Sequence, residues 1–296
     1  MTVLWFWLNR KNHTHTLEKV YLAAGIKRQS FSDWLNHKMK QKDIYCQLLP
    51  LVREIREEHP GMSSKIMYGM IKPKGIGRDK FIAWCNDQGF KLEQKRNLIR
   101  TTNSYGVTKF TNKIRSLKLE RSNQLWVSDI TYYRIKERFY YITLIMDQYS
   151  KKIVGYNTSY SLATTDTTIP ALNMALKNNQ LYKELILHSD GGGQYYCKEF
   201  LDITKGAEIT NSMTEDLGEN NHAERLNGTI KNQYLSGYMP TNFNQFAKEL
   251  KRAVKNYNET RPHQSLKKQM PSVIHQLSLI KKRTKLNTTI FTNNLQ

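Results

Sequence analysis

The sequence predicts an α/β protein in which a mixed sheet is covered by helices and preceded by an all-α region. Two observations carry this prediction. Apolar residues recur at helical spacing in the first third of the chain, and from Leu125 onward the period changes to the alternation of strands. After the third strand, helices and strands alternate, which is typical of an α/β core.

The first candidate helix-turn-helix spans residues 17–40. A helix from Leu17 to Ala24 is followed by Gly25, which suits a tight turn with positive φ, and by a basic, polar helix from Arg28 to His37. This outline is typical of a DNA-binding motif. The candidate DNA contacts lie where the second helix begins: Lys27, Arg28 and Gln29.

The second candidate, residues 44–95, begins with a long amphipathic helix from Ile44 to His59, which Pro60 and Gly61 terminate. A helix pair follows, from Ser63 to Ile71 and from Arg78 to Asp87. On pattern alone, each pair could equally be a helical hairpin with solvated lysines. The net charge of the region is therefore needed to choose between a DNA-binding motif and an ordinary helical hairpin.

The net charge of +21 over 296 residues calls for a polyanionic partner, usually nucleic acid. Basic against acidic residues number 24 to 10 in residues 1–124, 11 to 13 in residues 125–235 and 11 to 2 in residues 236–296. Two basic arms thus flank a slightly acidic centre. A protein that only coats DNA has no use for central carboxylates, whereas an enzyme that holds Mg²⁺ against a phosphate needs them.

This charge distribution favours residues 1–100 as a helical DNA-binding region. Residues 101–122 contain few large apolar side chains and are predicted to be a basic linker. Residues 123–275 form the predicted core with its C-terminal helices, and residues 276–296 a basic, flexible tail.

The sequence predicts neither a disulfide framework nor a zinc site. The three cysteines lie far apart, and His13 and His15 have no partners at zinc-finger spacing. The apolar run from Val3 to Leu8 is too short to span a bilayer. We therefore expect a cytoplasmic, nucleoid-associated protein without a membrane partner.

Three strands are predicted at Leu125 to Ile135, Phe139 to Met146 and Ile153 to Tyr160. The short polar turns between them indicate an antiparallel meander. Alternating helices and strands then follow, and two helices close the region: Asp166 to Lys177, Glu184 to Ser189, Lys198 to Lys205, Glu208 to Met213, Asn220 to Leu235, and Asn242 to Tyr257.

Three acidic residues lie at positions where an α/β core commonly forms its active site. Asp129 interrupts a strand fit for burial, where a carboxylate costs several kcal/mol unless a cation or hydrogen-bond donors compensate. Asp190 ends a strand and leads into three glycines, which allow a close approach of backbone or substrate. Alternation places four residues on one face of the first strand: Leu125, Val127, Asp129 and Thr131.

Glu224 lies on a helix at the edge of the predicted core. The apolar stripe of that helix is Ala223, Leu226, Ile230 and Tyr234. Polar residues share the side of Glu224 itself: Asn220, Asn227 and Lys231. The glutamate is therefore expected beside groups that can contact a substrate.

Hard oxygen ligands of this kind suit Mg²⁺ or Mn²⁺. Two such ions, roughly 3.5 to 4 Å apart, can activate the attacking hydroxyl and stabilise the leaving oxygen of a phosphodiester. In this hypothesis Asp129 bridges both ions, while Asp190 and Glu224 each complete one coordination shell.

Four segments in order resemble the signature blocks of integrase-like DDE insertion-sequence transposases, the insertion sequence three family: WVSDITY, LILHSDGGGQY, ENNHAERLNGTIKNQYL and YNETRPHQSL. The resemblance covers roughly Leu17 to His275. It implies a ribonuclease-H-like integrase catalytic core with helices on both faces, and catalysis by two Mg²⁺ or Mn²⁺ ions. By the motif match, the catalytic and metal-binding triad is Asp129, Asp190 and Glu224.

The resemblance also implies partners. They are the element's terminal inverted repeats and target DNA, a homo-oligomeric synaptic complex, and an upstream-frame DNA-binding protein. One departure concerns the spacing, because 33 residues separate Asp190 from Glu224 and family members commonly carry a slightly longer spacer. The shortage falls around residues 214–220, and Glu219 is a weaker substitute for Glu224 because it precedes the apolar pattern of the helix.

Two alternatives remain open at this point: a catalytically inactive or domesticated DNA-binding regulator, and a nuclease without strand transfer. Several further side chains are candidates for lesser roles. His188 and Gln194 flank Asp190 and could orient water or phosphate. The remaining candidate DNA contacts are Asn221, Arg225, Asn227, Lys231, Arg261 and His263, and Arg261, Pro262 and His263 could instead position the C-terminal helices.

Overall fold

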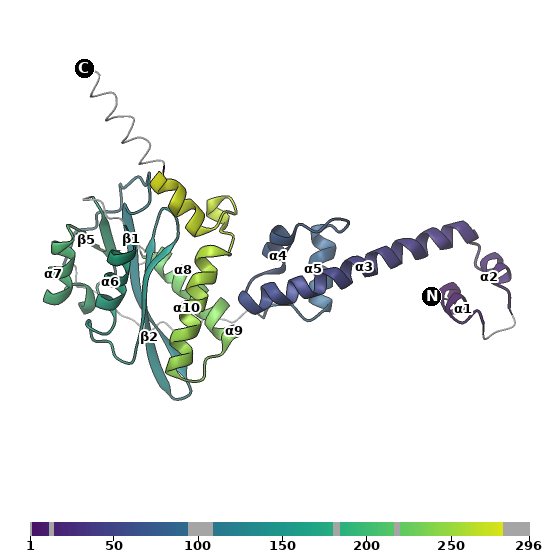
Figure 1. The fold of residues 1–296 in the computed structure, drawn as a ribbon, viewed down its shortest axis with the longest axis horizontal. Coiled ribbons are helices and arrows are strands. Elements are labelled where there is room, and N and C mark those ends of the chain that lie inside the picture. Colours follow the sequence, from purple (N-terminus) through teal and green to yellow (C-terminus); the bar gives the residue numbers. More distant parts are fainter. Residues whose placement is uncertain (1, 12–14, 94–108, 180–183, 216–219, 281–296) are drawn as a thin grey trace, which may run out of the picture. The chain divides into compact units, whose positions relative to one another are not determined.

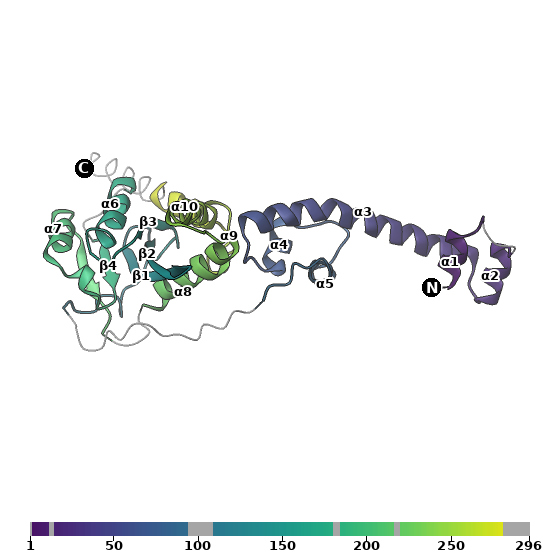
Figure 2. The same ribbon diagram turned by 90° about the horizontal axis from the view of Figure 1, so that it is seen from below.

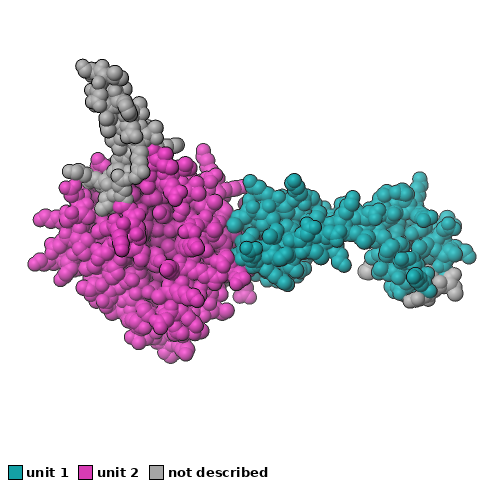
Figure 3. All heavy atoms as spheres, viewed as in Figure 1, with its two compact units in different colours: residues 1–55, 67–91 teal, residues 56–66, 92–296 magenta. Residues whose placement is uncertain are grey.

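The computed structural model describes residues 2–11, 15–93, 109–179, 184–215 and 220–280 (Figure 1). The chain divides into two compact units, residues 1–55 with 67–91 and residues 56–66 with 92–296 (Figure 3). Within the described residues, no helix is long and apolar enough to cross a membrane.

The first unit is helical, as predicted. Its elements are α1 Thr2–Leu8, α2 Leu17–Ala23, α5 Arg78–Asp87 and most of α3 Arg28–Glu58 and α4 Ser64–Ile71, whose residues 56–58 and 64–66 belong to the second unit. Gly25 between α2 and α3 has a φ of +64°, so the turn does use the left-handed conformation that glycine allows. Helices α2, α4 and α5 match the predicted ranges within a residue at each end.

Helix α3 corrects one expectation, because one continuous helix replaces the two that were predicted at Arg28 to His37 and Ile44 to His59. The residues between them contain no glycine or proline, and most are strong helix formers, so nothing interrupts the helix there. The helix also continues through Pro50. Helix α1 was not predicted.

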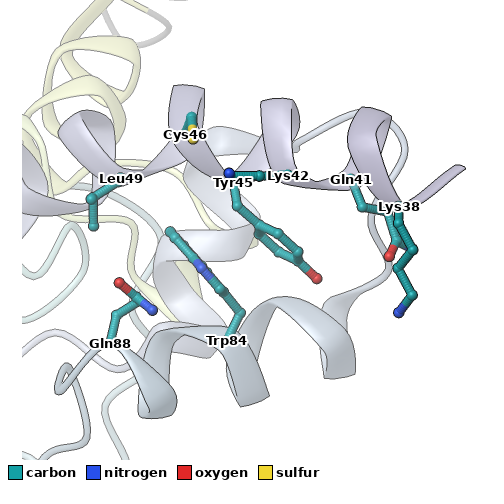
Figure 4. A pocket seen from close by; sticks show the side chains of 8 residues that line it. All are labelled: Lys38, Gln41, Lys42, Tyr45, Cys46, Leu49, Trp84 and Gln88. Atoms are coloured by element: carbon teal, nitrogen blue, oxygen red, sulfur yellow. The ribbon is translucent and has the colours of Figure 1, made fainter. Parts of the chain in front are cut away.

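A shallow groove lies between α3 and α5 in this unit (Figure 4). Tyr45 and Trp84 stack in it with ring centroids 5.2 Å apart and an interplanar angle of 19°. Lys38 and Lys42 line the same groove, so a basic edge accompanies the aromatic pair.

The second unit contains a five-stranded sheet in the order β3-β2-β1-β4-β5. Strands β1 Leu125–Ile135, β2 Arg138–Asp147 and β3 Ile153–Ser159 form the predicted antiparallel meander. Strands β4 Ile186–Ser189 and β5 Thr210–Met213 run parallel to β1, and each begins two residues later than predicted.

Helices cover both faces of this sheet (Figure 2), which confirms the predicted fold class. On one face lie α6 Thr168–Asn178 and α7 Lys198–Gly206. On the other lie α8 Asn221–Thr229, a π-helical turn Ile230–Leu235, α9 Ser236–Tyr238 and α10 Phe243–Glu259. Short 3-10 turns at Gly193–Tyr195 and Gln264–Leu266 and a helix over residues 271–280 complete the unit.

The π-helical turn departs from the single helix predicted from Asn220 to Leu235. In this turn the carbonyl of Gln233 accepts a hydrogen bond of 2.7 Å from the backbone of Gly61. A β-carbon at Gly61 would lie 2.4 Å from Cα of Gln233, so only glycine permits this approach. A segment distant in sequence, around Gly61, is therefore packed against the π-helical turn that follows α8.

The helix over residues 271–280 includes the first five residues of the segment expected as a tail; residues 281–296 lie outside the described part. Its His275 is buried, and Nδ1 lies 3.0 Å from the Ser150 hydroxyl in the turn between β2 and β3. Ser278 accepts a hydrogen bond of 2.8 Å from the backbone of Ser122. These contacts attach the helix to the sheet.

Candidate active site

Strand β1 places Asp129 between the sheet and α8. Leu125 and Val127 point into the hydrophobic cluster shared with α8 and α10, and Asp129 follows them on the same face, as predicted. Its Oδ2 accepts a hydrogen bond of 2.8 Å from Nδ2 of Asn227, and its Oδ1 accepts one of 2.9 Å from the backbone of Ile130. The carboxylate is thereby held at both oxygens.

Strand β4 places Asp190 beside Asp129, at the same position along the sheet. Val127 pairs with His188 in the parallel register, and Asp129 and Asp190 each lie two residues further along. Neighbouring strands are about 4.8 Å apart, so the two aspartates are neighbours on one face. Oδ1 of Asp190 accepts a hydrogen bond of 3.2 Å from the backbone of Gly192, where an added β-carbon would lie only 3.1 Å from that oxygen.

Helix α8 places Glu224 over β1. The helix is aligned by polar contacts along the strand: Nδ2 of Asn220 donates to the Ser128 carbonyl at 3.1 Å, and Nζ of Lys231 donates to the Thr131 hydroxyl at 3.0 Å. The predicted apolar stripe is buried behind them. Glu224 is exposed and belongs to the side of the helix that carries these polar residues, as the sequence indicated.

The three carboxylates act on one another electrostatically. Burial and the charge of Asp190, with a smaller contribution from Glu224, raise the pKa of Asp129 to about 7, although the hydrogen bonds from Asn227 and Ile130 oppose the shift. Burial and the charge of Glu224 also raise the pKa of Asp190. The site therefore concentrates negative charge that the neighbouring protein groups do not balance.

The donors fit a hard divalent cation in kind. Besides the carboxylates, Oδ1 of Asn220 and Oδ1 of Asn227 are buried and, within the described residues, have no hydrogen-bond partner. Such oxygens suit a hydrated Mg²⁺ or Mn²⁺. In the part of the chain that the structure describes, however, no three acidic, histidine or cysteine side chains converge closely enough to enclose an ion by themselves.

Comparison with known proteins identifies the family of this core. The family description "Integrase core domain" matches residues 120–216, and a second version of it matches residues 205–271. The uncharacterized 31 kDa protein of insertion element IS600 from Shigella sonnei is 29% identical over 252 residues, which cover 82% of this chain and 92% of that protein.

Two named transposases align with parts of the chain. The transposase InsF for insertion sequence IS3A from Escherichia coli (strain K12) is 33% identical over 31% of this chain and 32% of its own length. The transposase for insertion sequence element IS629 from Shigella sonnei is 34% identical over 45% of each. The chain belongs to the integrase-type DDE transposases of insertion sequences. The insertion sequence three type indicated by the motifs is thereby confirmed.

Among solved structures, the catalytic core domain of HTLV-2 integrase in complex with magnesium is similar with a TM-score of 0.44 and 21% identity. The similarity covers 52% of this chain and 96% of that one. A simian T-cell lymphotropic virus intasome gives a TM-score of 0.46 at 16% identity, over 68% of this chain and 67% of that one.

Two residues of the transposase core that were predicted to contact DNA form hydrogen bonds with other residues of the core. Asn227 is buried and is bonded to Asp129, so in this conformation it positions a carboxylate. Arg261 donates a hydrogen bond of 2.6 Å to the side chain of Gln233 in the π-helical turn. Lys231 is half-buried over the ring of Tyr132, with Nζ 4.6 Å from the ring centroid.

Other predicted contacts remain accessible. Asn221 and Arg225 are exposed on α8, and His263 is half-buried beside Ser265. In the first unit of the transposase three residues are exposed where α3 begins: Lys27, Arg28 and Gln29. His13 and Glu219 lie outside the described residues.

The residues that flank Asp190 have structural partners. Nδ1 of His188, which is buried, lies 3.0 Å from the Ser212 hydroxyl on β5. Nε2 of Gln194 donates a hydrogen bond of 3.1 Å to the carbonyl of Leu162. Both side chains therefore hold the end of β4 and its glycine turn in place beside the aspartate.

Long-range contacts behind the π-helical turn and α10 were not predicted from the sequence. His59 is buried and lies 2.8 Å from the Tyr234 hydroxyl and 3.0 Å from the Thr260 hydroxyl. Glu58 pairs with Arg252 at 2.8 Å. No local pattern marks these contacts, because they join residues separated by 175 or more positions.

Proposed function

We propose that this transposase cleaves and rejoins DNA strands at the terminal inverted repeats of its insertion sequence, with Asp129, Asp190 and Glu224 as the catalytic and metal-binding triad. One observation carries the proposal. Two adjacent parallel strands and one helix bring three carboxylates to a single face, where burial and the charges of Asp190 and Glu224 raise the pKa of Asp129, and burial and the charge of Glu224 raise the pKa of Asp190. Such mutual repulsion is typical of sites that a cation neutralises.

Two Mg²⁺ or Mn²⁺ ions bound there would supply activation of the attacking hydroxyl and stabilisation of the leaving oxygen. The protein's own groups orient the ligands. Asn227 fixes one oxygen of Asp129, and Gly192 fixes one oxygen of Asp190. Because the pKa of Asp129 is raised to about 7, protons compete with the cation, and metal affinity should increase as the pH rises through 7.

Helix α8 supplies the rest of the arrangement. Asn220 attaches the start of the helix to β1 at Ser128, and Lys231 attaches its end at Thr131. Between these two anchors, Glu224 is exposed and would be the third carboxylate to hold the cation, beside Asp129 and Asp190.

DNA recognition is assigned to the first unit. Its exposed residues Lys27, Arg28 and Gln29 follow the glycine turn and lie at the start of α3, which suits a recognition helix for the terminal inverted repeats. We further propose that the protein acts as a homo-oligomer in a synaptic complex with target DNA, near the bacterial nucleoid, and that an upstream-frame DNA-binding protein assists it.

The alternative of an inactive regulator is not favoured. All three carboxylates are present on one face of the sheet, and the named relatives are transposases. A regulator that uses the core only as a scaffold would gain nothing from a repulsive carboxylate site, because that site opposes folding at neutral pH.

The test uses the full chain, Mg²⁺ or Mn²⁺, and DNA that carries the inverted repeats flanking its own gene. We expect end cleavage or strand joining that disappears in Asp129→Asn, Asp190→Asn and Glu224→Gln, while binding of the same DNA persists. Unchanged activity in any of these variants would show that the triad is assigned wrongly.

A second measurement separates binding from chemistry. Affinity for the repeat DNA should fall steeply with salt concentration, because lysines and arginines release counterions from the phosphates. Affinity that does not depend on salt would contradict the role of the basic first unit. A triad variant is the matched control, since it should show the same salt dependence as the unmodified protein.

A further inference from the structure

The groove between α3 and α5 in the first unit of the transposase has no part in the proposed chemistry (Figure 4). Its hollow measures about 390 Å³, at the lower end of the range for ligand sites. We call it the aromatic groove. Its ligand-facing side chains are Lys38, Gln41, Lys42 and Tyr45 on α3, and Trp84 and Gln88 on α5.

Two aromatic rings form the wall of this groove. Tyr45 and Trp84 stack with their ring centroids 5.2 Å apart, and one ring comes from each helix. Both side chains are half-buried and both line the hollow, so part of each ring is open to a ligand. A flat group that enters the groove therefore meets an aromatic surface.

The aromatic wall is held in place from behind. Phe81 is fully buried, with its ring centroid 5.9 Å from that of Trp84 and 5.6 Å from that of Tyr68. Gly75, in the loop before α5, has a φ of +80°, and a β-carbon there would lie 2.9 Å from Cδ1 of Ile44 on α3. This close approach fixes the loop against α3, so the wall is preorganised for binding.

Positive charge without an acidic partner lies along one edge of the groove. Lys38 and Lys42 are exposed and four residues apart, so they are neighbours on α3. Within the described residues neither lysine forms an ion pair, and no acidic side chain lines the groove. Four residues before Lys38, Trp34 is 43% exposed, and its ring centroid lies 5.9 Å from Nζ of that lysine. One face of α3 therefore carries both aromatic and basic side chains.

We propose that the aromatic groove binds unpaired nucleotides of DNA. A base stacks against Tyr45 and Trp84, and the flanking phosphates pair with Lys38 and Lys42. Sites for single-stranded nucleic acid combine the same two elements, a positively charged groove and aromatic rings on which bases stack. The site is separate from the duplex contacts proposed at the start of α3, and it rests on the proposed function only in taking DNA as the ligand.

Unpaired nucleotides fit the groove better than duplex DNA or an acidic peptide. A duplex presents phosphates and base edges, while the faces of its bases are stacked on one another, so rings set between two helices would have no partner there. An acidic peptide would match the lysines but would leave the rings without a flat partner. Gln41 and Gln88 also line the groove, and each side-chain amide offers donors and an acceptor to the edge of an unpaired base.

The first test compares two ligands of equal charge for the full chain: a thymidine oligonucleotide, and one of the same length whose central nucleotides lack bases. A chelator removes divalent metal, so the result does not depend on cleavage. The unmodified protein should bind the thymidine oligonucleotide more tightly. Trp84→Ala should lower that affinity about 5- to 150-fold, the loss of one stacked base, and leave the abasic affinity unchanged. Equal losses for both ligands would overturn the proposal.

The second test concerns the phosphates and uses surface variants that leave the aromatic wall intact. Lys42→Gln should weaken binding of the thymidine oligonucleotide and lower the slope of log affinity against log salt by about 0.7, the value for one lost phosphate contact on a single strand. Lys40→Gln is the matched control, because Lys40 is exposed on the same helix but two residues away and thus on its opposite side. Equal losses for the two variants would show only an effect of net charge and would contradict the assignment.

The third test locates the base and separates DNA from a protein ligand. A photoreactive thiothymidine in the oligonucleotide should crosslink to Tyr45 or Trp84, and crosslinks confined to other segments would contradict the proposal. A polyglutamate peptide of equal charge that binds as tightly, with the same loss in Lys42→Gln, would identify a site for acidic protein instead. Trp84→Phe keeps a ring and should lose less affinity than Trp84→Ala at an unaltered thermal unfolding temperature. Since no metal is present, failure here leaves the triad untouched, and failure of the triad variants leaves this site untouched.

Discussion

The two faces of β1 differ in how they are closed. On the face toward α6 and α7, Trp126 is fully buried. The next residue of β1 on this face is Ser128, whose hydroxyl forms a hydrogen bond of 2.9 Å with the hydroxyl of Tyr195. Toward α8, burial of Leu125 and Val127 gives way at Asp129 to a polar, partly open surface. We call the face of β1 toward α6 and α7 the packed face, and the face toward α8 the chemical face.

The helices reflect the same difference. On the packed face, a β-carbon at Gly155 would lie 2.2 Å from the carbonyl oxygen of Ala171 in α6, so α6 lies almost directly on β3. On the chemical face, α8 is held to β1 through side-chain hydrogen bonds of Asn220, Asn227 and Lys231. We conclude that substitutions on the packed face should affect stability, and those on the chemical face should affect activity.

The largest effect is expected at Asp129. Asp129→Asn should reduce strand cleavage by at least about 10³-fold, since a ligand at the reacting centre is lost. Its free energy of unfolding at pH 8 should not fall, because the charged carboxylate is unfavourable there: its pKa is raised to about 7. Parallel activity assays and denaturant titrations check both statements. A large loss of stability would contradict the expectation that substitutions on the chemical face affect activity and not stability.

Trp126 provides the opposite case. The side chain is fully buried, and its Nε1 donates a hydrogen bond of 3.0 Å to Asn123. Trp126→Ala should lower the free energy of unfolding by about 3 to 5 kcal/mol. Trp126→Phe, as the matched variant, should lose less and keep its activity at temperatures where it is folded. Loss of activity in a fully folded Trp126→Phe would contradict the division.

Asn227 tests the support of the chemical face. Asn227→Ala removes the donor to Oδ2 of Asp129 and should weaken Mn²⁺ affinity by about 10 to 100-fold, as for other side chains that orient a metal ligand. Calorimetric titration measures the affinity. Asn221→Ala, an exposed neighbour on α8, is the control and should bind Mn²⁺ normally. Equal affinities for both variants would remove Asn227 from the site.

The last effect concerns the contact of His59 behind the π-helical turn. The pKa of His59 is lowered to about 4 by burial first and then by the charge of Arg261. The unfolded chain takes up this proton near pH 6.5, so the contribution of His59 to stability is present above that pH and is lost as the pH falls toward 4. The expected slope approaches about 1.4 kcal/mol per pH unit.

The matched variant is His59→Gln, which should reduce this slope in denaturant titrations between pH 7 and 4. Gln replaces a titrating ring with a side chain that can still reach the hydroxyls of Tyr234 and Thr260. An undiminished slope would show that other groups, such as His263, account for the acid sensitivity; the pKa of His263 is also lowered to about 4.

Much of the chemical face was predictable because its signals are local. The alternation around Asp129, the strand end at Asp190 and the stripe beside Glu224 each follow from the period of one element. The alignment of the two aspartates follows from a parallel pairing of β1 and β4, which the alternation of helices and strands only implied.

What the sequence could not reveal depends on distant contacts. The π-helical turn exists where the Gly61 backbone meets Gln233, and no property of residues 230–235 alone indicates it. The fusion of two predicted helices into α3 follows from the helix formers between them, yet periodicity treated them as separate.

Anomalous diffraction from crystals of the protein soaked in Mn²⁺ tests most directly where the cation binds. We predict anomalous density between the carboxylates of Asp129 and Asp190, on the side of the sheet that faces Glu224, and its loss in Asp129→Asn. Mn²⁺ bound elsewhere, or density at the site that persists in Asp129→Asn, would contradict it.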